Sequence, residues 1–147
     1  MNFFSRVLEN KVLMIALVSW TVAQGSKVLI EILSYRKVDL KRFVGSGGMP
    51  SSHSAFVMAL STGIGKLEGW ESPLFAIALS FAFVVMYDAA GVRRAAGKQA
   101  EILNIIIKDM VEHKVLKEER LKELIGHTPI EVIIGGIIGV ITANIMV

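Results

Sequence analysis

Four long apolar stretches, separated by polar segments, constrain the fold of this chain more than any other feature of its sequence. They cover residues 12–33, 53–67, 73–91 and 129–147, and each approaches the roughly 20 residues that a helix needs to cross a bilayer. The chain has 147 residues, and its 53% of hydrophobic residues exceeds the apolar share of an ordinary soluble domain. The sequence therefore predicts an all-α integral membrane bundle of about four transmembrane helices.

The segments between these stretches complete the predicted organisation. The second stretch is short and contains glycine, so we expect neighbouring helices to shelter part of it. Residues 93–126 are polar but keep the spacing of an amphipathic helix, which we expect at the membrane surface or against the bundle. A second short helix is expected at roughly 117–124. Because no internal repeat or low-complexity linker is present, residues 1–147 are predicted to form a single domain.

Basic residues are distributed unequally between the two ends of the predicted bundle. With four spans, the loops after the first and third spans share a face and carry Arg36, Lys37, Lys41, Arg42, Arg93, Arg94, Lys98, Lys108, Lys114, Lys117, Arg120 and Lys122. The opposite face has only Arg6, Lys11 and Lys66. Cytoplasmic loops usually carry the excess of Lys and Arg. We therefore expect the basic face to be cytoplasmic, in the plasma (inner) membrane, where it suits anionic lipids.

A first candidate motif, Gly-Gly-Met-Pro-Ser-Ser-His-Ser, places a glycine-rich turn at the start of the second apolar stretch. The first turn of a helix presents unpaired N–H groups and the positive end of its dipole, so it binds phosphate readily. Gly47 and Gly48 leave room for an anion, and Ser51 and Ser52 can donate to phosphate or cap the helix. His53 suits proton transfer near neutral pH. The alternative is a capped helix with a surface histidine.

A second motif, Asp-Ala-Ala-Gly-Val-Arg-Arg, ends the third stretch and is followed by Lys98. Arginine offers planar, bidentate hydrogen bonds to phosphate. A carboxylate near the end of an apolar helix is costly unless it is partnered, which makes Asp88 a candidate functional residue. The alternative is that Arg93 and Arg94 mark the membrane edge and that Asp88 pairs with one of them.

A third motif, Gly-His-Thr-Pro-Ile-Glu, opens the last stretch. Thr128 and Glu131 fit a capping box, with Pro129 at the first helical position. Glu131 also lies four residues after His127, where it can hold the imidazole in one tautomer. A histidine so oriented can attack phosphorus or act as a base. Capping leaves His127 unexplained, whereas the remaining histidine, His113, is expected at the surface.

The three motifs are predicted to meet on one membrane face, because they lie at the start of the second span, the end of the third and the start of the fourth. A polar stripe within the first stretch, Gln24, Lys27 and Glu31, adds a further candidate cation. Lys27 either serves this site or forms an ion pair with Glu31 against a neighbouring helix.

Over most of the chain, these motifs together resemble the divergent branch of the type 2 phosphatidic acid phosphatase and vanadium haloperoxidase superfamily. There a Pro-Ser-Gly-His motif supplies phosphate contacts and the general acid, and the Pro-Ser-Ser-His ending at His53 is similar to it. A later histidine is the nucleophile, oriented by an aspartate four residues on. His127 and Glu131 resemble that pair, with glutamate in place of aspartate.

Two parts of the superfamily pattern are missing. An arginine usually lies six residues before the nucleophile, where this chain has Leu121 between two basic residues. The superfamily's first motif, a lysine followed by Arg-Pro, has no clean counterpart. The cations that can replace these groups are Arg93, Arg94, Lys98, Lys27 and Lys41.

The resemblance implies a metal-independent phosphatase without a cofactor, which hydrolyses a lipid phosphate or pyrophosphate monoester through a phosphohistidine. In that reading His127 attacks phosphorus, His53 protonates the leaving oxygen, and Glu131 orients His127. The groups expected to hold or support the phosphate are Ser51, Ser52, Arg93, Arg94, Lys98, Lys27, Asp88 and Gly48. The expected partners are the lipid substrate and the bilayer, not nucleic acid, and the small size is compatible with a homodimer.

Two other functions fit parts of the sequence. CDP-alcohol phosphotransferases also keep aspartates, glycine and arginine at a membrane edge, but they need several aspartates around a metal, and this block has only Asp88. The non-catalytic alternative is a lipid-binding or scaffold membrane protein that retains the phosphatase-like fold. The missing arginine and the altered lysine motif are compatible with that alternative, while the phosphatase remains the leading hypothesis.

Overall fold

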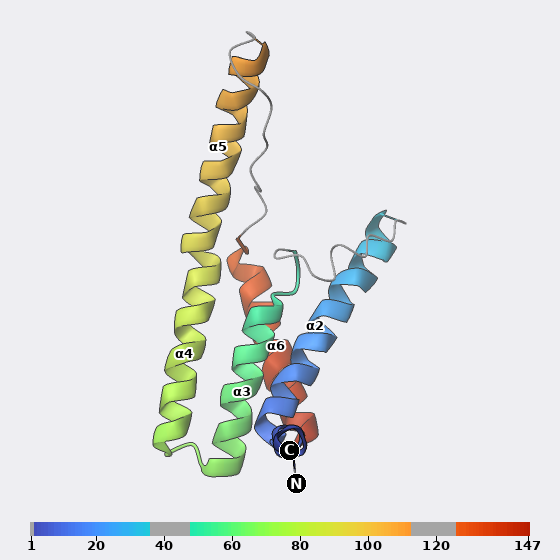
Figure 1. The fold of residues 1–147 in the computed structure, drawn as a ribbon, viewed down its shortest axis with the longest axis vertical. Helices are drawn as coiled ribbons and strands as arrows, with labels where there is room; N and C mark the ends of the chain where they lie inside the picture. The colour runs from blue at the N-terminus through green and yellow to red at the C-terminus, as the bar shows by residue number, and fades with distance from the viewer. Residues whose placement is uncertain (1, 36–47, 113–125) are drawn as a thin grey trace.

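The computed structural model describes residues 2–35, 48–112 and 126–147, and every regular element in these ranges is an α-helix. The helices are α1 (Phe3–Leu8), α2 (Lys11–Tyr35), α3 (Ser52–Glu68), α4 (Pro73–Ala90), α5 (Val92–Glu112) and α6 (Pro129–Met146). Helices α2, α3, α4 and α6 form an antiparallel bundle, shown in Figure 1. The predicted all-α class is confirmed, and the four apolar stretches correspond to these four helices.

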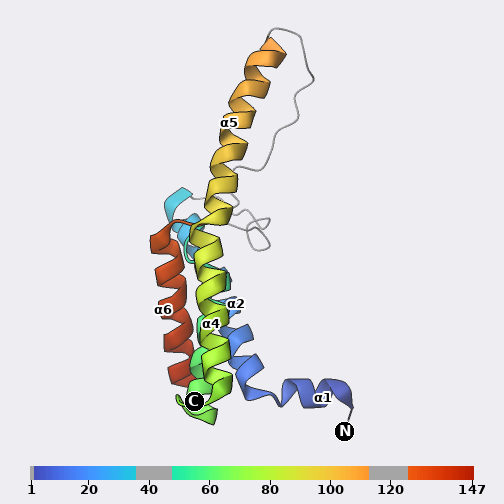
Figure 2. The same ribbon diagram turned by 90° about the vertical axis from the view of Figure 1, so that its left-hand side faces the viewer.

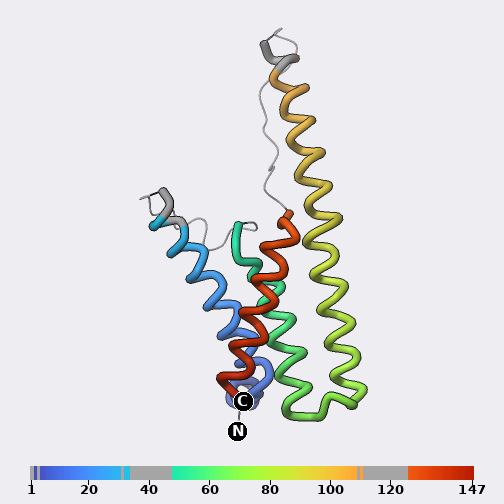
Figure 3. The backbone as a smooth tube through the Cα atoms, turned by 180° about the vertical axis from the view of Figure 1, so that it is seen from behind, coloured from blue at the N-terminus to red at the C-terminus, as the bar shows by residue number. Residues whose placement is uncertain are grey.

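Helix α3 is the centre of the bundle. It packs against α6, α2 and α4, and α2 and α4 lie on either side of it (Figure 1). In the described part of the chain no Cα atom of α2 lies within 8 Å of one of α4. The short helix α1 extends sideways from the end of the bundle at which both chain termini lie (Figure 2; Figure 3 shows the same end from behind). The start of α3, the end of α4 and the start of α6 therefore meet at the opposite end.

The bundle keeps small residues inside and large apolar residues outside. Its buried residues are mainly alanine, glycine and serine, whereas α4 exposes Ile77 and Val84 and α6 exposes Ile133 and Ile141. In water such a surface would drive aggregation, but in a bilayer small interfacial residues allow close helix packing and large ones face the lipid. This distribution fits a membrane-embedded bundle.

Three of the described helical segments are long and apolar enough to cross a membrane: Lys11–Ile30, Pro73–Lys108 and Pro129–Met146. Helix α3 has only 17 residues, about 25 Å of helix, which is shorter than the hydrocarbon core. Its serine and threonine side chains, including Ser54, Ser61 and Thr62, are buried by its neighbours. The expectation that this helix is sheltered is confirmed.

Close backbone contact joins α3 to α6. A Cβ atom added to Gly135 would collide with the carbonyl oxygen of Ser51, and one added to Gly139 would collide with that of Ala55. The two glycines are four residues apart and share one face of α6, the spacing that lets membrane helices approach closely. On the other side of α3, the Ser19 hydroxyl donates to the same Ala55 carbonyl at 3.1 Å. The start of α3 is thereby fixed against α6.

Helix α5 begins one residue after α4 ends and extends beyond the bundle (Figures 1 and 2). Among the described helices it packs against α4 only, so, of the two expected locations for this segment, packing along the bundle is not observed there. Its apolar residues are exposed: Ile102, Leu103, Ile105, Ile106 and Met110. A location at the membrane surface stays a prediction. The short helix predicted at 117–124, the loop at 36–47 and His113 lie outside the described residues.

Candidate functional site

The start of α6 is held by a capping box. The Thr128 hydroxyl accepts a hydrogen bond from the Glu131 N–H at 3.4 Å, and the Glu131 carboxylate accepts one from the Thr128 N–H at 3.0 Å. Pro129 occupies the first helical position, where its missing N–H costs nothing. The predicted cap is therefore present, and it fixes the Glu131 side chain at the membrane edge.

The same carboxylate also contacts His127. Glu131 Oε2 lies 3.1 Å from His127 Nδ1, and the backbone N–H of His127 donates to the Ala89 carbonyl at 3.1 Å. The His127 side chain is only 3% exposed. When Glu131 is ionised, Nδ1 carries the proton and donates it to the carboxylate, which leaves the lone pair on Nε2. The geometry thus provides one oriented imidazole with a nucleophilic nitrogen.

Burial sets the protonation state of His127. Its removal from water lowers the pKa of the imidazole below the usual 6.5, because the charged form is disfavoured. The hydrogen bond and charge of Glu131 oppose this shift, while the nearby charges of Lys27 and Arg93 add to it. The net direction is downward, so His127 is neutral near pH 7. A neutral imidazole is the form that can attack phosphorus.

The turn before α3 is joined to α6 by its backbone. Gly48 has φ +79°, a conformation that suits glycine. The Ser51 N–H donates to the Glu131 carbonyl at 3.0 Å. The Ser51 hydroxyl is fully buried and accepts from the Ser54 N–H at 3.4 Å and the Ser54 hydroxyl at 3.0 Å. Ser51 therefore caps α3, and its service as a phosphate ligand stays a prediction.

Lys27 brings a buried cation to the same place. Its side chain is 7% exposed, and its Nζ donates to the Ser52 hydroxyl at 3.4 Å. It is also close enough to Glu131 for the two charges to attract each other. A buried ammonium inside an apolar helix is retained in proteins mostly where it is used. The alternative partner, Glu31, has a side chain outside the described part of the structure.

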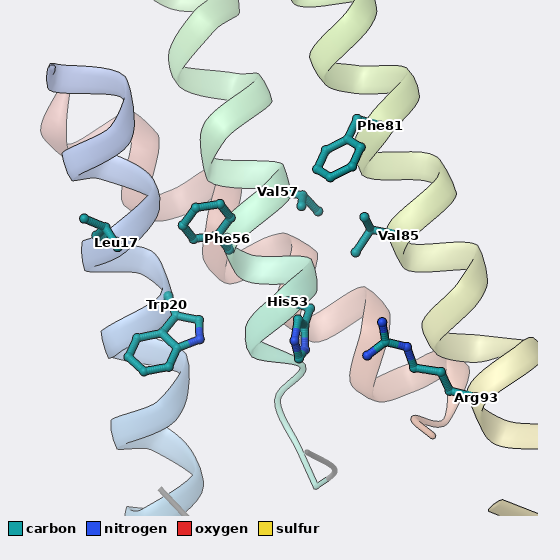
Figure 4. Close-up of a pocket in the computed structure, with 8 residues that line it drawn as sticks. All are labelled: Leu17, Trp20, His53, Phe56, Val57, Phe81, Val85 and Arg93. Carbon is teal, nitrogen blue, oxygen red and sulfur yellow. The ribbon is translucent and has the colours of Figure 1, made fainter. Parts of the chain in front are cut away.

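His53 and Arg93 both line a pocket of about 470 Å³. Figure 4 shows the Arg93 side chain reaching toward His53 from the end of α4 and the start of α5. Arg93 Nε also forms an ion pair with Asp88 Oδ2, so the alternative pairing considered for Asp88 is present. Arg93, His127 and Lys27 are all close enough to His53 for their charges to interact with that of its imidazole. Three motifs distant in sequence therefore meet at one end of the bundle.

The remaining predicted phosphate ligands lie farther along α5. Arg94 and Lys98 are both exposed, and neither lines the pocket that His53 and Arg93 share. The backbone of Gly126 approaches that of Arg94 so closely that a Cβ at Gly126 would collide with it. Roles for Arg94 and Lys98 stay predictions.

The sequence did not reveal the residues that line the pocket. Its apolar walls are formed by Leu17, Trp20, Phe56, Val57, Phe81 and Val85. In the sequence these side chains are indistinguishable from ordinary lipid-facing residues, because helical spacing does not show which helices leave a gap. The glycine pair that brings α6 to Ser51 had a detectable signal, its four-residue spacing.

Comparison with known proteins places these residues in a wider group. A family model described as the divergent PAP2 family matches residues 8–142. The uncharacterized membrane protein YuiD of Bacillus subtilis (strain 168) is 42% identical over 151 aligned residues, which cover 95% of this chain and 96% of the relative. No solved structure matches the chain significantly. The family match includes all three motifs of the site.

Proposed function

Because this chain belongs to the divergent PAP2 family, named for type 2 phosphatidic acid phosphatases, we propose that it is a membrane phosphatase. Its substrate is a lipid phosphate or pyrophosphate monoester, and its intermediate is a phosphohistidine. The observation that carries the proposal is the hydrogen bond between the buried His127 and Glu131, at the same end of the bundle as His53 and Arg93.

In the first step, the Nε2 lone pair of His127 attacks phosphorus and the bond from phosphorus to the lipid oxygen breaks. His53 donates a proton to the leaving oxygen, so the lipid departs as an alcohol or, from a pyrophosphate, as a monophosphate. Glu131 accepts the Nδ1 hydrogen bond throughout and stabilises the positive charge that develops on the imidazole.

In the second step, a water molecule attacks the phosphohistidine. His53, now neutral, removes a proton from that water, and the bond from phosphorus to Nε2 breaks. Inorganic phosphate leaves, and both histidines return to their starting states. The chain supplies every proton transfer in this cycle.

The negative charge of the phosphoryl group needs cations nearby. Arg93 offers a bidentate contact, Lys27 offers a buried ammonium beside Ser52, and the start of α3 adds the positive end of a helix dipole. Such preorganised charges stabilise the transition state of phosphoryl transfer more than they stabilise the bound substrate. Asp88 positions the Arg93 guanidinium through their ion pair.

A phosphate-release screen over a panel of lipid phosphates tests this function. Purified wild type releases phosphate from at least one member, His127→Ala releases it at the background rate, and His53→Ala is slower by about 10²–10⁴-fold. His113→Ala, which removes the only other histidine, is the matched control and keeps wild-type activity. Full activity in His127→Ala contradicts the proposal.

The non-catalytic alternative makes a different prediction in the same screen. The ion pair of Arg93 with Asp88 and the capping role of Ser51 both occupy groups that phosphate would use. A lipid-binding protein with the phosphatase fold would bind lipid phosphates and release no phosphate from any of them. That result would replace the enzymatic proposal.

A further inference from the structure

The pocket beside the site is mostly apolar and has its two ionisable residues at one end. His53 opens α3, and Phe56 and Val57 follow it into the bundle. On the other wall Arg93 lies in the first turn of α5, and Phe81 lies on α4 about 14 Å of helix before its last residue, Ala90. Figure 4 shows Trp20 level with His53, on the side away from Arg93, and shows Val57, Val85 and Phe81 farther along the bundle.

The pocket lies where α2 and α4 flank α3, with no Cα atom of α2 within 8 Å of α4 in the described residues. One wall comes from Leu17 and Trp20 of α2 and the other from Phe81 and Val85 of α4. Phe81 is 52% exposed on the surface of α4, a surface that faces lipid in a membrane-embedded bundle. The pocket is thus an apolar groove open between two helices, and we define it by these four residues with Phe56 and Val57.

From this arrangement, and resting on the phosphatase function proposed above, we propose that the apolar groove binds a hydrocarbon chain of the phosphorylated lipid and sets the preferred chain length. The phosphate lies at His53 and Arg93, and the chain runs along α3 between α2 and α4.

The occupant follows from charge and burial. Arg93, which lines the groove, attracts an anionic headgroup, and the buried Lys27 beside Ser52 adds positive charge nearby. The groove walls are stabilised only by contact with an apolar surface. A water-soluble phosphate ester carries the negative charge but has no apolar chain for the groove. A neutral lipid has the apolar chain but lacks the charge. A lipid phosphate that enters sideways from the bilayer has both.

A chain-length series tests the proposal through activity. We expect kcat/KM for monomeric alkyl phosphates to rise by about fourfold per added methylene, from 0.8 kcal/mol per buried CH₂, until the groove is filled. Val85→Phe places a ring inside the groove, so the rise stops at a shorter chain while the shortest esters react as before. Val84→Phe is the matched control, because Val84 is 66% exposed and does not line the groove. Equal chain-length profiles for both variants overturn the proposal.

A binding measurement separates this inference from the proposed function. Trp70→Phe leaves Trp20 as the only tryptophan, and the further His127→Ala change removes turnover. A brominated alkyl phosphate then quenches Trp20 fluorescence at concentrations where the equivalent brominated alcohol does not, and Val85→Phe weakens the quenching at least tenfold. If the alkyl phosphate quenches Trp20 but the wild type shows no turnover, the proposed phosphatase activity is wrong and lipid binding in the groove is supported. If the wild type shows turnover but phosphate and alcohol quench equally, the groove proposal is wrong and the phosphatase activity is supported.

Discussion

Glu131 links three parts of the site. Its carboxylate accepts from Thr128 and contacts His127, and its backbone carbonyl accepts from Ser51. The cap, the imidazole and the start of α3 are therefore positioned by one residue. A side chain one methylene longer than the aspartate of the wider superfamily suffices here, because the capping box fixes where its carboxylate lies.

At the residue scale, Glu131→Gln tests the orienting role. The amide removes the charge that raises the pKa of His127, so the acid limb of the kcat/KM profile moves to lower pH. The plateau falls by about 10²-fold, since the imidazolium loses its charged partner. Glu101→Gln, at an exposed position on α5, is the control and leaves the profile unchanged. A lower plateau without a shift of the limb would mean that Glu131 acts only through the cap.

The lowered pKa of His127 makes a second prediction about pH. The reaction needs neutral His127, so kcat/KM falls as the pH drops through the pKa of this group. Because burial lowers that pKa below 6.5, activity persists to a pH below the usual midpoint of histidine. A pH–rate profile of the wild type checks this. An acid limb centred above 6.5 would contradict a buried, neutral nucleophile.

At the scale of elements, the contact of α6 with α3 positions His127 relative to His53. Gly135→Ala places a methyl group against the Ser51 carbonyl, and overpacking of this kind costs about 1–3 kcal/mol. We expect a lower melting temperature in detergent and a loss of activity. Gly25→Ala is the matched control, since a Cβ at Gly25 meets nothing within 4 Å. Equal stability of the two variants would show that α3 and α6 are not held by this contact.

The elements themselves were predictable from the sequence. Apolar runs with turn residues between them located α2, α3, α4 and α6, and the alternating direction of these four helices brought the three motifs to one end. The capping box and the contact of His127 with Glu131 followed from spacing alone. Local patterns of this kind depend on residues within one helical turn, so one sequence is enough to find them.

The contacts between elements were not predictable. Helical spacing put Lys27 on a polar stripe of α2, but only the packing of α2 on α3 shows that it contacts Ser52. The apolar groove arises where α2 and α4 fail to meet, which no single helix encodes. For α5, amphipathic spacing fits a helix on the bundle as well as one that extends from α4 beyond it.

At the scale of the whole molecule, the basic end of the bundle sets the predicted orientation. The site, the end of α4 and the start of α5 share that end (Figure 1), so we predict a cytoplasmic active site. The chain has no cysteine, so single introduced cysteines report each side. A membrane-impermeant thiol reagent reaches Gln99→Cys only from the cytoplasmic side and Glu71→Cys only from outside. The reverse pattern would place the site outside.

The most direct test of the central claim is to trap the phosphoenzyme. Wild-type protein is mixed with a lipid phosphate labelled in its phosphoryl group, denatured in alkali within the first turnovers and digested. We expect an alkali-stable, acid-labile label on the peptide that contains His127, present in Glu101→Gln and absent from His127→Ala. Rapid hydrolysis of the same lipid with no label on His127, or with label on His53, would contradict it.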